Sequence, residues 1–136
     1  MPRLDLYHHA VKQALQKDGW TITHDPLLLR WGESKLFADL GAELIAAENS
    51  TRKIAVEIKT FLVANMAELQ RALGQYLMYE RILERTEADR SLYLAVSQEA
   101  FDTVFRQDVA KLLLADGDFK LFVFDEQKEV ITRWLP

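Results

Sequence analysis

The chain has 136 residues, the size of one ordinary domain, and we expect a single domain over residues 1–136. It is 49% hydrophobic and 28% charged, so it can bury a sizeable core, and intrinsic disorder is excluded as its main state. It contains no cysteine, which excludes disulfide scaffolds, zinc–thiolate sites and thiol catalysis. The net charge of −4 argues against a protein that coats nucleic acid, but not against an enzyme that meets DNA over a small patch.

The lengths of the apolar runs indicate whether the chain could cross a membrane or carry a signal peptide. None approaches the roughly 18 residues needed to span a bilayer. The first fifteen residues have the pattern of an amphipathic helix and lack the apolar centre of a signal peptide. We therefore expect a soluble, cytoplasmic protein with no membrane contact.

The first half of the chain predicts one helix followed by strands. Apolar residues at helical spacing begin near Leu4, and Gly19 is a natural stop for that helix. A short strand then ends at Asp25-Pro26. Two longer strands flank a polar run and predict a hairpin. The predicted strands cover residues 20–23, 35–47 and 53–60, and the polar run covers residues 48–52.

The second half predicts a long helix over residues 65–86. Asn65 and Glu68 have the spacing of a capping box. An apolar stripe on this helix consists of Leu69, Leu73 and Leu77.

Residues 91–96 are almost continuously apolar, which is typical of a strand that is buried on both faces. Ser97 can cap a helix that continues to Leu114, and residues 120–124 and 129–134 predict a final hairpin. The long helix before strand 91–96 fits a right-handed crossover between parallel strands. The expected fold class is therefore α/β, with a central mixed sheet flanked by helices.

Three charged residues interrupt the apolar strands of the predicted hairpin. Glu57 and Lys59 point to the same face of one strand, where burial is costly unless the charges are paired or bind something. The midpoint of positions 39 and 57 is position 48, at the start of the polar turn, so the hairpin places Asp39 beside Glu57. Two such carboxylates repel each other unless a cation neutralises them.

This arrangement of hard oxygen ligands, with neither cysteine nor a nearby histidine, favours Mg²⁺, with Mn²⁺ as a substitute. Lys59 would then position a water molecule and stabilise charge on a phosphoryl oxygen. Glu43 is a rival carboxylate, but it lies about 13 Å along the strand from Asp39, so both cannot bind one metal. A buried structural ion pair between Glu57 and Lys59 is the alternative.

The spacing of Asp39 and Glu57-Ile58-Lys59 resembles the PD-(D/E)xK nuclease motif, with Ala38 where the motif often has proline. The resemblance implies a restriction endonuclease-like fold. It also implies that both carboxylates bind the metal, that the carbonyl of Ile58 assists, and that Lys59 orients the attacking water.

Two further features bear on this site. Gln75 and Tyr79 lie four residues apart on the long helix, off the predicted apolar stripe. RecB-type members of the superfamily carry a similar pair near the active site, although a plain polar helix face is the alternative. Related nucleases also take a glutamate from the first helix, which here has none, so that role is vacant or belongs to Asp5 or His8. A histidine at the edge of the core is the commoner explanation of His8.

Six segments lie in order along nearly the whole chain: residues 17–29, 39–48, 53–61, 72–80, 90–97 and 129–136. Together they resemble the XisH-like family. This family is named for the fdxN element excision controlling factor of heterocyst-forming cyanobacteria. The resemblance implies a role in programmed DNA excision during heterocyst differentiation, beside a site-specific recombinase and a second small factor, XisI.

Two hypotheses follow. The first is a Mg²⁺-dependent DNA endonuclease or nicking enzyme. Nuclease folds of this size often cut both strands as dimers, so we expect a homodimer. The second is a non-catalytic accessory protein that keeps the nuclease fold and binds XisI or the recombinase. The complete set of Asp39, Glu57 and Lys59 favours the first, whereas the acidic net charge and the lack of an obvious basic stripe favour the second.

Overall fold

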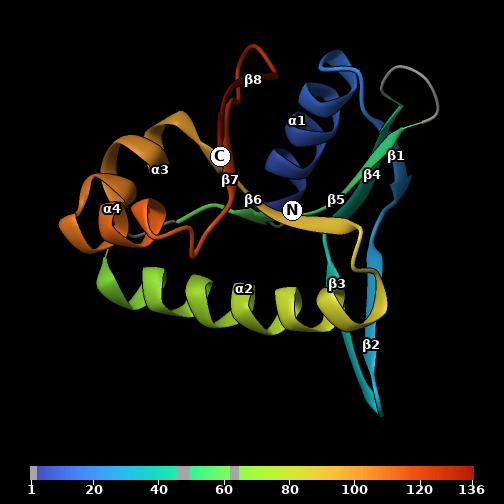
Figure 1. Ribbon diagram of the computed structural model, residues 1–136. Helices are drawn as coiled ribbons and strands as arrows, with labels where there is room; N and C mark the ends of the chain where they lie inside the picture. Colours follow the sequence, from blue (N-terminus) through green and yellow to red (C-terminus); the bar gives the residue numbers. More distant parts are fainter. Residues whose placement is uncertain (1–2, 46–49, 62–64) are drawn as a thin grey trace.

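The computed structural model describes residues 3–45, 50–61 and 65–136, with side chains described from residue 7 onward (Figure 1). The first half contains α1 (Arg3–Lys17), β1 (Thr21–His24), β2 (Leu27–Trp31), β3 (Ser34–Ala38), β4 (Leu40–Ile45) and β5 (Thr51–Lys59). The second half contains α2 (Met66–Thr86), β6 (Arg90–Ser97), α3 (Gln98–Thr103), the 3₁₀ helix η1 (Val104–Arg106), α4 (Asp108–Ala115), β7 (Leu121–Asp125) and β8 (Val130–Leu135).

Six strands form the central sheet, in the order β1-β4-β5-β6-β7-β8. The pairs β5–β6 and β6–β7 are parallel, whereas the outer pairs are antiparallel. Helix α2 is the connection that joins β5 to its parallel neighbour β6, as the sequence predicted. The expected α/β class with a mixed sheet between helices is confirmed. No helix in the described part of the chain is long and apolar enough to cross a membrane.

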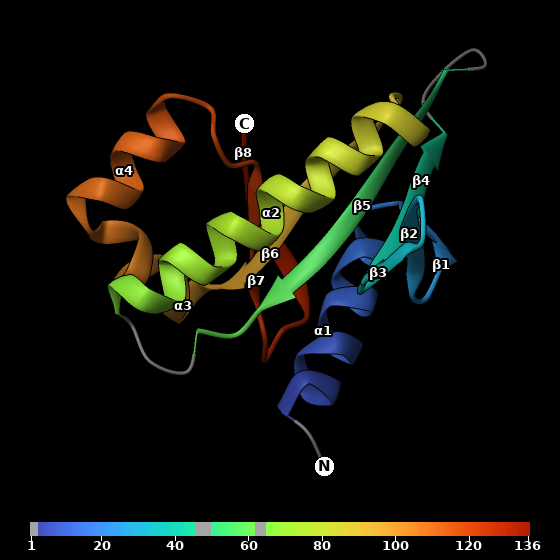
Figure 2. The same cartoon turned by 90° about the horizontal axis from the view of Figure 1, so that it is seen from below.

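Helices cover both faces of this sheet, with α1 on one side and α2 on the other (Figures 1 and 2). Alternate residues of β5 enter the two cores: Ala55 packs in the core that includes α2, whereas Ile54 and Val56 pack in the core that includes α1. Because side chains alternate along a strand, Glu57 and Lys59 fall on the α2 side with Ala55. The strand thus directs both charged groups toward one face.

The chain between β1 and β5 differs from the prediction. One strand over residues 35–47 was expected, but the structure has a separate two-stranded hairpin of β2 and β3, followed by β4. Gly32, with a φ of 60°, lies in the turn of this hairpin. Leu27 and Leu29 are buried in the α2-side core, so the hairpin forms because that helix covers its inner face. The predicted strand end at 46–47 and the turn at position 48 lie outside the described residues.

The helix predicted from Ser97 to Leu114 is interrupted. The Ser97 hydroxyl accepts a hydrogen bond from the Ala100 N–H at 3.2 Å, which confirms it as an N-cap. After α3 and η1, however, Gln107 adopts an extended conformation with φ −66° and ψ 143°, and α4 begins only at the next residue. The break turns α4 away from the direction of α3 (Figure 2).

Helix α2 has the predicted limits but a different buried face. The Asn65 side chain caps it by accepting a hydrogen bond from the Glu68 N–H at 2.9 Å. Leu77, which the predicted stripe placed in the core, is 50% exposed, whereas Tyr76 and Tyr79 are buried. Tyr76 can face inward because its hydroxyl donates to the carbonyl of a residue in β6, which satisfies the polar group.

Candidate active site

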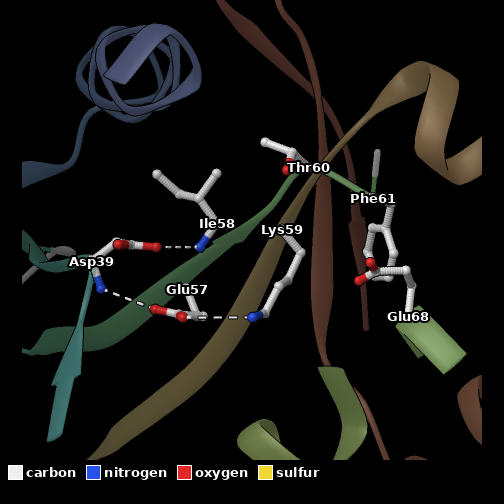
Figure 3. Close-up of a pocket in the computed structure, with 7 residues that line it drawn as sticks. All are labelled: Asp39, Glu57, Ile58, Lys59, Thr60, Phe61 and Glu68. Atoms are coloured by element: carbon white, nitrogen blue, oxygen red, sulfur yellow. Dashed lines mark hydrogen bonds and ion pairs between the residues drawn. The ribbon is translucent and has the colours of Figure 1, made fainter. Parts of the chain in front are cut away.

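The break between β3 and β4 places Asp39 directly beside Glu57. Pairing of Leu40 with Val56 sets the register, so Asp39 faces Glu57 at the end of the β4–β5 ladder. The Asp39 N–H donates to Glu57 Oε1 at 3.2 Å, and the Ile58 N–H donates to Asp39 Oδ2 at 2.8 Å (Figure 3). Each carboxylate is therefore held by the backbone of the opposite strand. The predicted juxtaposition of Asp39 and Glu57 is confirmed.

Lys59 completes the group from the end of β5. Its Nζ lies 3.9 Å from Glu57 Oε2, well beyond the 2.7–2.9 Å of a charge-assisted hydrogen bond. Both side chains line a pocket of about 280 Å³, together with Thr60 and Phe61 (Figure 3). The ammonium is thus near Glu57 but free to contact a molecule in the pocket.

The electrostatics of the pocket are unfavourable for two bare carboxylates. Glu57 is only 7% exposed, and its burial, reinforced by the negative charge of Asp39, raises its pKa to about 8. Lys59 opposes this increase only in part. At neutral pH, Glu57 therefore carries a proton unless a cation takes the place of that proton.

The donor set fits a hard divalent cation. Carboxylate oxygens of Asp39 and Glu57, together with the Ile58 carbonyl, are ligands of the kind that Mg²⁺ prefers. The described residues contain no cluster of three or more histidine or acidic side chains arranged to hold a metal. The protein would supply only part of the coordination shell, which suits Mg²⁺ because that ion keeps several waters or takes oxygens from a phosphate.

Glu68 also lines this pocket, and sequence reasoning missed this role. It was recognised only as part of a capping box, and it lies in the first turn of α2. Its nearest cation is Arg71, at 3.8 Å. The signal that could have revealed it is its position at the start of the helix that follows the Glu57 strand. Figure 3 shows it across the pocket from the two paired carboxylates.

Gln75 and Tyr79 lie on the inner side of α2, which corrects the expectation that they lie off the core face. Gln75 Nε2 donates to the Tyr79 hydroxyl at 2.9 Å, and Tyr79 is buried. Burial, with a contribution from the charge of Glu57, raises the pKa of Tyr79. The buried Gln75 Oε1 has no hydrogen-bond partner among the described residues. The pair is therefore close enough to the acidic pocket to sense its charge.

His8 and Glu43 lie apart from the pocket lining. His8 Nε2 lies 2.6 Å from Asp25 Oδ1, and Lys12 contacts the other oxygen of the same carboxylate at 2.8 Å. Glu43 sits in the β4–β5 ladder opposite Lys53. Asp5 falls within α1, but its side chain is outside the described part of the structure.

Comparison with known proteins agrees with this architecture. The family model for the XisH protein matches residues 1–132. The chain belongs to the XisH family. An XisH family protein from Nostoc punctiforme PCC 73102 is 38% identical, with a TM-score of 0.84, over 97% of this chain and 100% of that chain. An fdxN element excision controlling factor protein from Anabaena variabilis is 40% identical, with a TM-score of 0.85, over 97% of this chain and 99% of that chain.

No curated protein matches the chain. The family resemblance predicted from six sequence segments is confirmed, because the XisH match extends over nearly the whole sequence. The two XisH-type crystal structures share the fold at almost full length.

Proposed function

We propose that this XisH family protein is a Mg²⁺-dependent DNA endonuclease or nicking enzyme that acts in programmed DNA excision. The observation that supports the proposal most directly is the pairing of Asp39 with Glu57 in a pocket that also contains Lys59. The name of the Anabaena variabilis relative, an fdxN element excision controlling factor, supports the biological role. Such a protein would act on DNA in the cytoplasm of a heterocyst-forming cyanobacterium.

The residues of the pocket divide the work as in a PD-(D/E)xK nuclease with a restriction endonuclease-like fold. Asp39, Glu57 and the Ile58 carbonyl would hold Mg²⁺ or Mn²⁺. The ion, when bound, would neutralise phosphate charge and lower the pKa of a water molecule. Lys59 donates to the attacking water and to the phosphoryl oxygen on which charge develops. Gln75 and Tyr79 support the site from α2.

A structural ion pair explains the pocket less well. A pair that exists only for stability brings opposite charges into hydrogen-bond contact, because desolvation is otherwise uncompensated. Here the closest contacts of Glu57 are with Asp39, and the lysine stands at 3.9 Å. An arrangement that raises the pKa of Glu57 to about 8 is costly on its own and becomes favourable when a divalent cation binds.

Metal binding is the direct test of this assignment. Calorimetric titration with Mg²⁺ or Mn²⁺ should show binding to the wild type that Asp39→Asn and Glu57→Gln each abolish. Glu43→Gln is a matched control, because it removes a carboxylate from β4 outside the pocket lining and should leave the affinity unchanged. Equal binding by the wild type and both pocket variants would contradict the site.

Cleavage is tested separately with supercoiled plasmid DNA in Mg²⁺. Nicked or linear product from the wild type, but not from Glu57→Gln, is expected. A homodimer would bring two pockets to opposite strands, so we expect linear product to increase with the dimer fraction measured by light scattering. Metal binding without any cleavage would contradict the nuclease activity while leaving the metal site intact.

A second candidate function is an accessory protein that binds a XisI-like protein and, through it or directly, the recombinase. The β2–β3 hairpin supports it, because Leu28, Trp31 and Phe37 are exposed on that hairpin, and exposed aromatic residues are enriched at protein interfaces. Co-expression with a XisI-like protein should give a complex that co-elutes on a sizing column. The double variant Leu28→Ser with Phe37→Ser should weaken that complex, and separate elution of the wild-type proteins would contradict it.

A further inference from the structure

A second cavity, larger than the acidic pocket, lies between α3, η1, α4 and β8. Its volume is about 440 Å³, and we call it the α3–β8 groove. Arg106, Lys111 and Arg133 line it, and Asp102 is the acidic residue in that lining. The chain as a whole has a net charge of −4, so this groove has the opposite charge balance from the protein. A local cationic site in an acidic protein favours an anionic ligand.

The three cations of the groove are available to such a ligand. None of them forms an ion pair with a carboxylate in the described part of the chain. Both oxygens of Asp102 instead accept from Gln98 Nε2, at 3.2 and 3.3 Å. The guanidinium of Arg133 lies over the ring of Phe101 at 5.2 Å, a contact that orients its plane and leaves its N–H groups for other acceptors.

The groove neighbours the acidic pocket, and a pair of packed aromatic rings separates the two. Phe61 lines the acidic pocket and Phe105 lines the α3–β8 groove. Their ring centroids are 5.5 Å apart at an interplanar angle of 87°, which is an edge-to-face contact. A polymer with one phosphate in the acidic pocket would cross this ring pair to reach the groove.

We propose that the α3–β8 groove binds the phosphate backbone of the DNA strand that continues from the Asp39–Glu57 site, an inference that rests on the proposed nuclease function. A chain of phosphates matches three separate cations along an open surface better than a small ion does, because phosphate contacts supply most of the affinity of proteins for DNA. Cations beside aromatic rings are also typical of grooves that follow a nucleic-acid strand.

The test compares two double variants that remove equal charge. Arg106→Gln with Lys111→Gln empties the groove of two exposed cations. Arg30→Gln with Lys35→Gln removes one exposed arginine and one exposed lysine from facing positions of the β2–β3 hairpin, away from α4. Both are made in the Glu57→Gln background and measured by fluorescence anisotropy in EDTA, so that binding is read without metal and without cleavage.

We expect the groove variant to bind DNA about tenfold more weakly than its parent at 50 mM salt. The slope of log K against log salt should become shallower by about 1.4 for a single strand or 1.8 for a duplex, since each lost phosphate contact contributes about 0.7 or 0.9. The affinity for single-stranded DNA and the affinity for duplex DNA are compared, and the form whose affinity falls more is the form that occupies the groove. The hairpin variant should stay within twofold of the parent, and both should melt within a few degrees of it.

Other outcomes separate the groove from the nuclease. A parent protein that binds through the groove, while the wild type never cuts in Mg²⁺, supports the groove and contradicts the nuclease. A wild type that cuts, with a groove variant of unchanged KM and unchanged affinity, contradicts the groove alone. Equal losses in both double variants also contradict it. A last outcome would also contradict the proposal. If binding of poly-glutamate depends on Arg106 and Lys111 but binding of DNA does not, the ligand of the groove is an acidic peptide.

Discussion

Two charged side chains are buried in neighbouring strands of the central sheet, and their surroundings differ completely. Arg90, at the start of β6, is 5% exposed; its Nη1 donates to the Ile54 carbonyl at 2.9 Å, and its Nε lies 3.4 Å from the Glu87 carboxylate without a hydrogen bond. Glu57, near the end of β5, is 7% exposed and faces the carboxylate of Asp39. The arginine lies beside an opposite charge and a carbonyl. The glutamate accepts one backbone N–H and has Lys59 at 3.9 Å, but the like charge of Asp39 and its own burial outweigh both.

The difference shows how a structural charge can be told from a functional one. Burial is equal, so desolvation alone does not separate them. Arg90 is compensated within the protein by a carbonyl and a nearby carboxylate, which suits a group that fixes the packing of two strands. Glu57 is compensated poorly, which raises its pKa to about 8 and leaves a place for an external cation. An uncompensated buried carboxylate in a pocket is therefore the stronger sign of function.

The largest expected effect tests whether Lys59 stabilises the fold or the reaction. If Lys59 neutralised Glu57 as a structural partner, Lys59→Ala would cost about 3–5 kcal/mol of stability. At a contact of 3.9 Å we expect a melting temperature within a few degrees of wild type in Mg²⁺. DNA cleavage should fall at least a hundredfold, since the variant loses about 3–4 kcal/mol of transition-state stabilisation.

Plasmid cleavage and thermal melting of the same preparations check this prediction. Lys53→Ala is a control, because Lys53 lies in the same strand and pairs with the exposed Asp89 at 3.3 Å. That variant should cut at the wild-type rate. An unfolded Lys59→Ala, or one that cuts normally, would place Lys59 in the structural class with Arg90.

The second effect is a dependence of stability on pH without metal. Glu57 has a folded pKa of about 8 against an ordinary value of 4.5, so the folded state binds its proton more tightly than the unfolded state does. The contribution of the protonated group to stability is complete below pH 4.5 and is lost as pH rises toward 8. Denaturant unfolding in EDTA should show the wild type losing about 1 kcal/mol per pH unit relative to Glu57→Gln between pH 5 and 8.

Saturating Mg²⁺ should stabilise the wild type but not Glu57→Gln. Wild type should gain about 2.7 kcal/mol at a metal concentration of 100 times Kd, and Glu57→Gln should gain nothing. Metal affinity of the wild type should also rise with pH up to about 8, because the ion replaces the proton of Glu57. Parallel pH profiles of the two proteins in EDTA would contradict the assignment of the raised pKa.

The third effect concerns Arg90, the buried charge that has partners within the protein. Arg90→Met keeps the apolar stem but removes the donor to the Ile54 carbonyl, so we expect a stability loss of about 2 kcal/mol. Cleavage per folded molecule should not change, because Arg90 lies at the opposite end of β6 from the residue that pairs with Lys59. Denaturant titration and plasmid cleavage measure the two quantities. A variant with full stability but lost activity would contradict the structural role of Arg90.

The sequence predicted the acidic pair because its position depends on local rules. Alternation of side chains along a strand and the midpoint of a hairpin are enough to set Asp39 beside Glu57, even though the predicted strand over residues 35–47 was wrong in detail. The parallel crossover through α2 followed in the same way from the order of elements. The site could thus be located without knowing how the rest of the chain packs.

What the sequence could not predict depends on contacts between distant segments. The β2–β3 hairpin is a strand pair whose inner face is covered by α2, and Leu27-Leu28-Leu29 shows no alternation that would indicate it. The rotation of α2 that buries Tyr76 and exposes Leu77 depends on backbone groups of other elements. The α3–β8 groove likewise combines four elements, α3, η1, α4 and β8, so its cations appear unrelated in the sequence.

The smallest expected effects concern two buried tyrosines on α2. Like Arg90 and Glu57, one is expected to serve stability and the other the site. The Tyr76 hydroxyl donates to the Leu92 carbonyl at 3.0 Å and accepts from the Lys120 N–H at 3.1 Å, so it joins α2 to the backbone. The Tyr79 hydroxyl accepts from Gln75 and senses the charge of the pocket. Tyr76→Phe should therefore cost about 1–2 kcal/mol of stability and leave cleavage per folded molecule unchanged.

Tyr79→Phe should lower DNA cleavage but have little effect on stability. It removes no partner from a backbone group, so the stability loss should stay below about 1 kcal/mol. Cleavage should fall severalfold, about 1 kcal/mol in the barrier, because the hydroxyl that orders Gln75 beside the acidic pocket is missing. Gln75→Ala should give a similar loss that is not additive with Tyr79→Phe, since the two side chains act through one hydrogen bond. Additive losses, or wild-type cleavage by both variants, would show that the pair only fills the core.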